Sequence, residues 1–193
     1  MIKSKREYHE YLQADKKALG IISGGIFIMI KNLLAPHLIW RFQKALRKAE
    51  YYKNCRKNIF DNICYLFAKY RLRKISVKLG FSIPENVFGP GLAIVHYGTI
   101  VINSNAKIGA NCRIHACTNI GASGGSPLAP EIGNNVYIGP GAKIYGNIKI
   151  GNNIAIGANA TVFKSFEEDN IMIAGNPGKR IQEIDIKKII KHI

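Results

Sequence analysis

The chain has 193 residues, 47% of them apolar, so it is long enough to bury a core as one domain or as two small ones. Its formal net charge of +16 is uneven, since residues 1–80 hold 18 Lys and Arg against 5 Asp and Glu, whereas residues 81–193 hold 10 against 7. The apolar content excludes a disordered chain, and the charge places any surface for an anionic partner in the first 80 residues.

Residues 1–80 form a basic region with a helical pattern. Apolar side chains recur at spacings of three and four over residues 37–52 and again over residues 55–78, with basic side chains on the other faces, which predicts two helices. Gly80 is typical of a residue that ends a helix, and Pro84 begins extended structure. We therefore expect an N-terminal helical region that ends near residue 80.

An apolar run over residues 20–30 has the sequence GIISGGIFIMI and ends at Lys31. It has about half of the ~20 residues needed to span a bilayer, so a transmembrane helix is not expected. Two interpretations stay open: a buried helix or intersubunit segment, or an element that lies on an anionic membrane together with nearby Trp40 and basic side chains. Because the strongly charged N-terminus is unlike a signal peptide, we expect a cytoplasmic protein, either free or peripheral at the inner face of the membrane.

Four cysteines, Cys55, Cys64, Cys112 and Cys117, show neither metal-ligand nor Cys-x-x-Cys spacing. We expect them to be free thiols in a reducing compartment, and we expect no metal. Nucleic acid is a further polyanion that would suit the basic region. No DNA- or RNA-binding motif accompanies the charge, however, so no nucleic-acid partner is expected.

Between residues 102 and 162 an aliphatic residue recurs at nearly every sixth position, often followed by Gly. The repeated positions are Ile102, Ile108, Ile114, Ile120, Ile132, Ile138, Ile144, Ile150, Ile156 and Val162. A period of six is typical of a β-helix, because six residues make one flat side of a coil with its corner, roughly 20 Å in all. Three such sides close a triangular coil whose aliphatic residues form a continuous core, with Gly or Asn at corners that need a positive φ.

Two histidines and one interruption depart from the repeat. His96 falls where the register, extended backwards from Ile102, expects an aliphatic residue, and His115 stands where Gly is usual. Each is either a functional residue or a surface residue at an irregular corner. Residues 121–131, with the sequence GASGGSPLAPE, interrupt the repeat without changing its phase, and loops that protrude from rigid scaffolds commonly build sites.

At these residues the chain resembles the serine acetyltransferase branch of the hexapeptide-repeat acyltransferases, and especially the shorter, polysaccharide-associated O-acetyltransferases. The resemblance covers residues 84–181 continuously. It is carried by Gly89-Pro90-Gly91-Leu92 before His96, by the run from Val136 to Gly146, by Ile156-Gly157-Ala158-Asn159-Ala160, and by Ala174-Gly175-Asn176-Pro177-Gly178-Lys179. The fold that it implies is mainly β: a left-handed parallel β-helix over residues 81–180, after an α-helical region at residues 1–80 and before a short C-terminal helix at residues 181–193.

The resemblance also implies a mechanism. His96 is the general base, which takes a proton from an acceptor hydroxyl while that oxygen attacks the thioester of acetyl-CoA in a direct transfer without a metal. His115 is the secondary candidate for this role. In this family acetyl-CoA lies extended along the groove between neighbouring subunits. The resemblance therefore implies a homotrimer or a dimer of trimers. Matched residue by residue, the cofactor-binding positions are Pro140 and Ala158, through their backbone, and Lys164 and Lys179, near the nucleotide end.

The departures from the family concern the acceptor. Serine acetyltransferases carry acidic residues directly before the catalytic His and further upstream, and an Arg-His pair before the Pro that follows the loop. Here these places hold Val95, Phe81 and the pair Leu128-Ala129. None of these side chains pairs with the ammonium or carboxylate of an amino acid, and a buried unpaired charge costs several kcal/mol. Glu85 is the candidate that replaces the missing carboxylate beside His96.

We therefore expect O-acetylation of a sugar hydroxyl within a precursor of a bacterial surface polysaccharide. Candidate residues of the acceptor pocket are Tyr97, Asn103 and Asn119. The alternative enzyme is a serine O-acetyltransferase of cysteine biosynthesis. A non-enzymatic β-helix scaffold is the third function class, and it leaves the histidine motif and the closing lysines unexplained.

Overall fold

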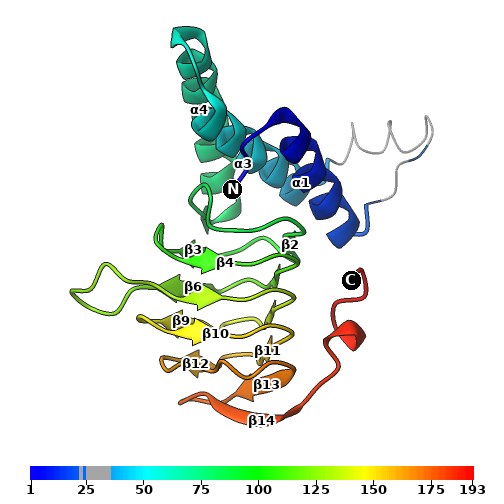
Figure 1. Cartoon of the computed structure of the whole chain (residues 1–193), viewed down its shortest axis with the longest axis vertical. Coiled ribbons are helices and arrows are strands. Elements are labelled where there is room, and N and C mark those ends of the chain that lie inside the picture. Colours follow the sequence, from blue (N-terminus) through cyan, green and yellow to red (C-terminus); the bar gives the residue numbers. More distant parts are fainter. Residues whose placement is uncertain (22–23, 25–35) are drawn as a thin grey trace.

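The structure is a computed structural model, which describes residues 1–21, 24 and 36–193. Within these ranges, helices precede residue 80 and short strands follow it, so a helical cap sits on one end of a column of coils (Figure 1). The helices are α1 (Lys5–Ala18), α3 (Leu38–Cys55) and α4 (Ile59–Leu79). α3 and α4 agree within a few residues with the two helices predicted from the apolar spacing.

α1 was not among the helices predicted from the sequence. Its N-cap is Ser4, whose hydroxyl accepts a hydrogen bond from the Glu7 N–H at 3.1 Å, while the Glu7 carboxylate accepts one from the Lys3 N–H at 2.7 Å. A Ser followed three residues later by Glu is a helix-start signal, and the sequence contains it. The apolar spacing that follows is weak because most residues of the segment are charged or polar.

The apolar run over residues 20–30 lies outside the described residues except for Gly20, Ile21 and Gly24, so both interpretations of it stay predictions. None of the described helices is long and apolar enough to cross a membrane.

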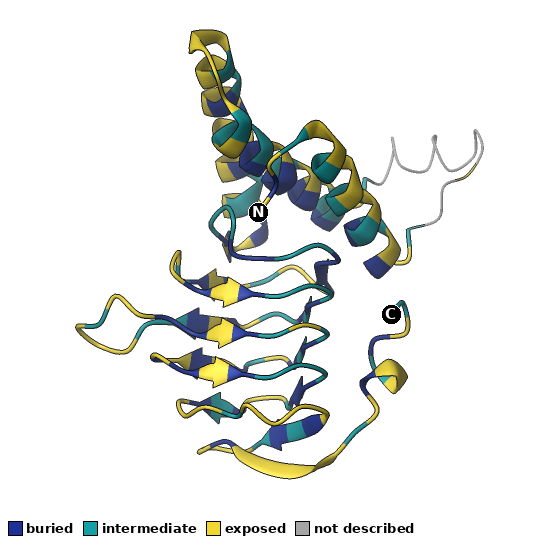
Figure 2. Cartoon of the chain, in the orientation of Figure 1, coloured by how far each residue is buried: buried dark blue, intermediate teal, exposed yellow. Residues whose placement is uncertain are grey.

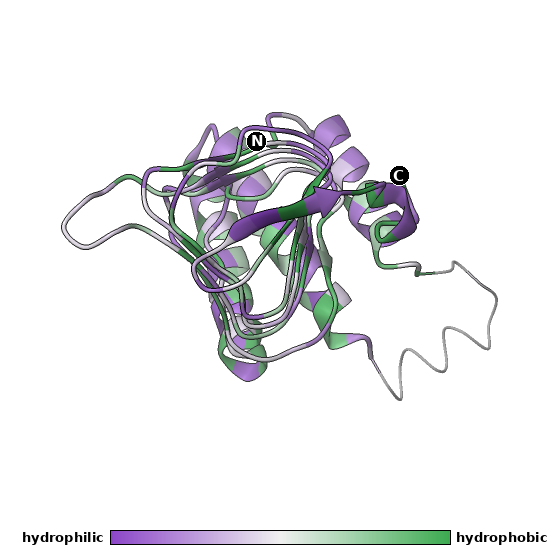
Figure 3. Ribbon diagram, turned by 90° about the horizontal axis from the view of Figure 1, so that it is seen from below, coloured by the Kyte–Doolittle hydropathy of each residue, from purple (hydrophilic) through white to green (hydrophobic). Residues whose placement is uncertain are grey.

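From residue 81 the chain winds through short strands that build three faces, which outline a triangle when seen from below (Figure 3). β1, β3, β6, β9 and β12 form one parallel sheet, β4, β7 and β10 the second, and β2, β5, β8, β11 and β13 the third, with β14 antiparallel at its edge. The predicted left-handed parallel β-helix is confirmed. The strands are β1 (Phe81–Ser82), β2 (Ala93–Ile94), β3 (Ile100–Ile102), β4 (Lys107–Ile108), β5 (Arg113–Ile114), β6 (Thr118–Gly121), β7 (Glu131–Ile132), β8 (Tyr137–Ile138), β9 (Lys143–Tyr145), β10 (Lys149–Ile150), β11 (Ala155–Ile156), β12 (Thr161–Val162), β13 (Ile171–Ala174) and β14 (Lys179–Glu183).

The core of the column consists of aliphatic ladders. In the third sheet Ile94, Ile114 and Ile138 stand in register on successive coils, and all three are fully buried. In the strands, buried inward positions alternate with outward positions, as the dark blue and yellow of Figure 2 show. Burying one such side chain stabilises the fold by roughly 1.5–3 kcal/mol. The aliphatic residues of the six-residue repeat therefore contribute much of the stability of the β-helix.

Asn and Gly stand at the corners for different reasons. Asn111, Asn135 and Asn153 have φ of 56°, 56° and 55°, and their side-chain amides form a ladder with N–O distances of 2.9 and 2.8 Å. Gly133 is required by a close approach, since a Cβ there would lie 2.6 Å from the Gly151 carbonyl oxygen of the next coil. The predicted use of Asn at positive φ is therefore correct.

The cysteines are free thiols, as predicted. Cys112 is buried inside the coil, and this burial raises the pKa of its thiol. Cys117 instead lies exposed at a corner, with a φ of 62°.

Buried polar contacts join the helical cap to the first coil. The guanidinium of Arg47 in α3 is fully buried and donates to the carbonyl oxygens of Phe88 and Gly89 at 3.0 and 2.7 Å. Gln43 of the same helix donates to the Leu92 carbonyl at 2.6 Å. Apolar packing continues across the junction, so the cap and the column share one core.

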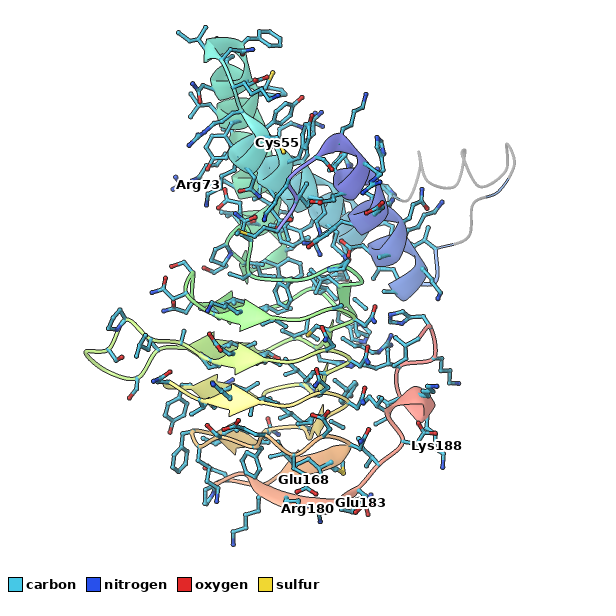
Figure 4. All side chains as sticks on the ribbon, in the orientation of Figure 1. Cys55, Arg73, Glu168, Arg180, Glu183 and Lys188 are labelled. Atoms are coloured by element: carbon cyan, nitrogen blue, oxygen red, sulfur yellow. The ribbon has the colours of Figure 1, made fainter. Side chains whose placement is uncertain are left out.

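The predicted C-terminal helix over residues 181–193 is wrong in extent. Residues 179–183 form β14, whose hydrogen bonds cover the edge of β13, and only a 3₁₀ turn, Ile186–Lys188, follows. Arg180 in β14 pairs with Glu168 at 3.0 Å and with Glu183 at 3.5 Å, as Figure 4 shows. Ile186 and its neighbours then pack against the third sheet, because this apolar surface and the open strand edge together compete with local helix formation.

Candidate active site

His96 lies at an enlarged corner of the first coil. Ile102 follows Ile94 by eight positions, whereas their partners on the next coil, Ile120 and Ile114, are six positions apart. The two additional residues push the corner outward, and His96 is exposed there. The register extended backwards from Ile102 therefore failed at this corner, and with it the expectation of an inward position for His96.

The corner is tied to the end of α4. The Gly98 N–H donates to the Leu79 carbonyl at 3.0 Å, and the Ile100 N–H donates to the Gly80 carbonyl at 3.1 Å. Gly80 itself caps α4 with a φ of 77°. The backbone on the C-terminal side of His96 is thus held by hydrogen bonds even though the imidazole is open to solvent.

His115 stands beside His96 on the adjacent coil, because β2 and β5 are paired, β5 ends directly before His115 and β2 ends two residues before His96. The two ring centroids are 6.1 Å apart, with 57° between the ring planes. Tyr137, one coil further on, places its ring edge-on against His115 at 5.1 Å and 64°. The coil register therefore brings together two imidazoles and a phenol that are far apart in the sequence.

His115 is in a less polar environment than His96. Burial lowers the pKa of the His115 imidazole, and the positive charge of Arg113 and the neighbouring His96 lower it further. Its Nε2 is buried and has no hydrogen-bond partner within the described ranges. His115 is therefore neutral near pH 7 and adds no positive charge beside His96.

Glu85 does not reach His96. Its carboxylate is nearly buried, lies 3.6 Å from the Lys53 ammonium and 3.8 Å from that of Lys69, and accepts a hydrogen bond from the Tyr65 hydroxyl at 3.4 Å. In the parts of the chain that the structure covers, no ion pair or hydrogen bond links any carboxylate to His96. The suggestion that Glu85 orients His96 is therefore wrong, because Glu85 instead pairs with the helical cap.

The predicted acceptor residues occupy different places on the first sheet. Tyr97 shares the corner of His96 and is 69% exposed. Asn119 is exposed on the outer side of β6, in register with Val101. Asn103 lies beyond the far end of β3 from His96, and its side-chain oxygen accepts a hydrogen bond from the Asn105 N–H at 2.8 Å. The structure thus brings Tyr97, but not Asn103, to the His96 corner.

The four positions that replace the charged residues of serine acetyltransferases also differ in exposure. Phe81 is only 5% exposed and packs edge-on against Phe42 with ring centroids 4.9 Å apart, and Ala129 is 6% exposed. Leu128 is 52% exposed, and Val95 is half-buried. Phe81 and Ala129 belong to the core, so only Val95 and Leu128 of these four side chains are open to an acceptor.

Below His96 the corners of the third sheet form a column of small residues. The register of β5, β8 and β11 places Ala116, Pro140 and Ala158 at equivalent positions on successive coils. Pro140 and Ala158 are exposed, and none of the hydrogen bonds among the described residues uses the Ala158 N–H. Ala116 was missed because it follows His115 without any unusual residue type, and only the register places it in this column.

The two lysines lie on the last coils but at different corners: the register of the first sheet places Lys164 beyond β12, on the side of Asn103, whereas Lys179 lies opposite Ala174 at the end of β13. Lys164 follows β12 and holds its Nζ 5.5 Å from the centre of the Phe166 ring, and Lys179 begins β14 on the last coil. Both are exposed. Among the described residues, no group of three or more His, Cys, Asp or Glu side chains is placed to hold a metal ion.

The comparisons with known proteins agree with this arrangement. A protein-family description, bacterial transferase hexapeptide (six repeats), matches residues 129–164. A Dictyostelium discoideum protein named as an acetyltransferase is 35% identical over 162 residues, which cover 79% of this chain and 83% of the relative. The chain belongs to the hexapeptide-repeat acetyltransferases. This acetyltransferase is therefore an enzyme, and the scaffold alternative is set aside.

Other relatives of this acetyltransferase are serine acetyltransferases. That of Synechococcus elongatus is 35% identical over 106 residues, or 54% of this chain, but the match covers only 43% of the relative. The crystal structure of the serine acetyltransferase of Brucella abortus in complex with coenzyme A has 26% identity and a TM-score of 0.73, covering 94% of this chain and 70% of that one. This chain thus spans less than half of the curated serine acetyltransferase that it matches.

Proposed function

We propose that this acetyltransferase transfers the acetyl group of acetyl-CoA directly to a hydroxyl of a sugar, in a precursor of a bacterial surface polysaccharide. The observation that carries the proposal is the enlarged corner, where an exposed His96 imidazole stands above the column of Ala116, Pro140 and Ala158. In this arrangement an acceptor hydroxyl reaches the imidazole from solvent, while a thioester arrives along the column.

His96 acts as general base and then as general acid. It accepts the proton of the acceptor hydroxyl while the oxygen attacks the thioester carbonyl, and a tetrahedral intermediate forms. The carbon–sulfur bond then breaks, and the imidazolium returns the proton to the thiolate, so the products are an acetyl ester and CoA. Proton transfer of this kind contributes about 10²- to 10⁴-fold to the rate.

The column suits the arm of acetyl-CoA. The unused Ala158 N–H is a donor for an amide carbonyl of the arm, and Pro140 offers an exposed surface one coil nearer to His96. We propose that the exposed side chains of Lys164 and Lys179, on the last coils, meet the phosphates. A single column provides only one wall of a groove, so we propose that the acetyltransferase works as a homotrimer or as a dimer of trimers.

The charges near His96 favour a neutral acceptor. Within the described ranges no carboxylate bonds to His96, and among the charges that act on the neighbouring His115 the cationic Arg113 has the largest effect. An amino acid would need partners for both of its charges, and leaving one unpaired costs several kcal/mol. A sugar needs hydrogen bonds only, and Tyr97 offers one at the same corner.

Serine is the second candidate acceptor. It is favoured by the relatives named serine acetyltransferases, including the coenzyme A complex with 26% identity. The test is release of CoA thiol by the purified protein with serine and, separately, with glycans from the producing cell. A kcat/KM for serine above about 10⁴ M⁻¹s⁻¹, the low end of ordinary enzyme efficiency, would exclude the sugar proposal.

A further inference from the structure

The outer side of α4 carries large apolar side chains that the described part of the chain leaves mostly uncovered. They recur at spacings of three, four and seven, so they lie along one face of the helix. Figure 2 shows the free end of α4 largely in the colour of exposed residues. We name this face the apolar stripe; it consists of Ile59, Ile63, Leu66, Tyr70 and Val77, which are 80%, 59%, 65%, 61% and 76% exposed.

Beside the apolar stripe, a groove runs between α3 and α4. It is made of two adjoining hollows of about 410 and 240 Å³, which share Arg41, Ala45 and Arg71. No acidic residue lines either hollow. We name this the basic groove, after its six cations: Arg41, Lys44, Lys48, Arg71, Lys74 and Lys78.

The cations of the basic groove are not neutralised by the described part of the protein. The ion pairs of the cap involve other residues: Arg47 pairs with Asp15, and Lys53 and Lys69 pair with Glu85. Three groove cations instead lie over aromatic rings, Lys44 over Trp40 at 5.6 Å, Lys48 over Tyr52 at 5.9 Å and Arg71 over Phe67 at 5.7 Å. Their charge is therefore directed at solvent, where it attracts anions.

The groove and the stripe adjoin one another through Phe67. Its side chain lines the groove and is 62% exposed. On the helix surface, residues four apart are neighbours, so Phe67 stands between Ile63 of the stripe and Arg71 of the groove. Apolar and cationic side chains thus form one continuous surface on the outside of the cap.

We propose that the apolar stripe and the basic groove together are a docking surface for a bilayer that contains anionic phospholipids. The six cations, which form no ion pair among the described residues, complement the phosphates of such headgroups, and a stripe of large apolar side chains next to them inserts into the headgroup region. A second copy of the chain on this surface would bring six cations against six. A nucleic acid would match the groove but leave the stripe exposed to water.

This inference rests on the proposed function and takes up the peripheral location at the membrane expected from the sequence, and it assigns the contact to α3 and α4 rather than to residues 20–30. It also connects location with catalysis. α4 has 21 residues and is therefore roughly 30 Å long. Its last residue, Leu79, accepts a hydrogen bond from Gly98 in the corner of His96. A bilayer that binds α4 lies within that length of the imidazole, close enough for a lipid-linked acceptor.

The test is flotation of the full chain with vesicles of phosphatidylcholine alone or with about 30% phosphatidylglycerol, at about 50 mM and 500 mM salt. Three variants accompany the wild type. The groove variant is Lys44→Gln, Lys48→Gln, Arg71→Gln, Lys74→Gln, and the stripe variant is Ile63→Ser, Leu66→Ser, Tyr70→Ser. The control is Lys149→Gln, Lys187→Gln, Lys188→Gln, Lys191→Gln, which removes the same charge from exposed sites; Figure 4 shows Lys188 beside the lower coils of the column, away from α4.

We expect the wild type to bind anionic vesicles in low salt only, and the groove variant to bind at least about tenfold more weakly, since each basic side chain near the surface adds to the partition. The control changes binding by less than about threefold. The stripe variant loses binding with its sedimentation mass unchanged. Equal binding to both vesicle types, wild-type binding by the groove variant, or a changed mass of the stripe variant overturns the proposal. The last result would make the stripe an interface between copies.

Activity separates this inference from the proposed function. The groove variant keeps its turnover with a water-soluble acceptor, because the basic groove contributes no side chain to the His96 corner. If the wild type binds vesicles as described but transfers acetyl only to serine, the acceptor proposal fails and the docking surface stands. If it acetylates sugars but does not bind vesicles, the docking surface fails alone.

Discussion

The guanidinium of Arg47 and the carboxylate of Asp15, 32 positions apart in the chain, form a fully buried ion pair with Nε 2.8 Å from Oδ2. The other Asp15 oxygen accepts hydrogen bonds from the Gly91 and Leu92 N–H groups, both at 2.9 Å. One carboxylate thus joins α1, α3 and the segment that leads into β2 and then His96.

Replacing Asp15 with Ala is expected to destabilise the fold by about 3–5 kcal/mol, because it leaves the buried Arg47 charge with Glu50 as its only ionic partner among the described residues and frees two backbone donors. The free energy of unfolding, measured by denaturant titration, checks this. The matched control is Glu10→Ala on the same helix, whose pair with Arg6 is exposed and contributes about 1 kcal/mol or less. Equal losses in the two variants would contradict the role given to Asp15.

His96→Ala is expected to lower kcat at least about 10²-fold with little change in the affinity for acetyl-CoA, because it removes proton transfer and no cofactor contact. His115→Ala should lower kcat much less. Steady-state thiol release and equilibrium binding of CoA measure the two quantities. If His115→Ala proves the more damaging, His115 is the base and His96 its neighbour.

His115 also predicts a pH dependence of stability. Burial holds its pKa below the ordinary value of 6.5, so the unfolded chain binds a proton that the folded chain resists. The stability is therefore fully present above about pH 6.5 and falls as the pH drops below it. The His115→Gln variant has no imidazole at this position that takes up a proton on unfolding. Its fall in Tm between about pH 7.5 and pH 5 should therefore be smaller than in the wild type.

The matched control for that experiment is His9→Gln at an exposed position of α1. Its pH profile of Tm should follow the wild type. Burial, with Lys17 and Arg113 nearby, also lowers the pKa of His192, so part of the acid sensitivity is retained in His115→Gln. A profile of His115→Gln that matches the wild type at every pH would show that this imidazole is accessible to protons in the fold.

Lys164→Ala and Lys179→Ala are each expected to raise the KM for acetyl-CoA several-fold with kcat nearly unchanged, because a phosphate contact binds ground state and transition state alike. Lys187→Ala, an exposed lysine on the C-terminal segment, is the control and should leave both constants unchanged. A loss of kcat in the lysine variants without a change in KM would move these residues out of the nucleotide end of the groove.

The proposed trimer can be tested by measuring the mass of the protein in solution. Sedimentation equilibrium at micromolar protein should give three or six times the mass of the chain, which is 21.4 kDa. A monomer would leave the column of Ala116, Pro140 and Ala158 with a single wall, and the cofactor proposal would lose its physical basis.

The β-helix could be predicted from the sequence because its six-residue period is visible as a recurrence of Ile or Val. Each of the repeated aliphatic residues from Ile102 to Val162 has a buried, equivalent neighbour on an adjacent coil, so one pattern determines strand, register and core together. The position of His96 could not be predicted, because the side with eight residues occurs only once and no repeated pattern in the sequence shows where the two additional residues lie. The contacts of Glu85 were equally hidden, because its partners Lys53 and Lys69 are supplied by helices whose placement depends on tertiary packing.

Two of the places where the chain departs from six residues per side share a property. Both the corner of His96 and the loop at residues 121–131, which projects clear of the column in Figure 1, add their length outside the ladder and leave the aliphatic register intact. The residues that stabilise the column and the residues proposed to act in catalysis therefore lie at separate positions of this chain. Such corners can therefore be lengthened, shortened or exchanged with little effect on the stability of the column. The acceptor specificity of the enzyme can change in this way while its scaffold stays the same.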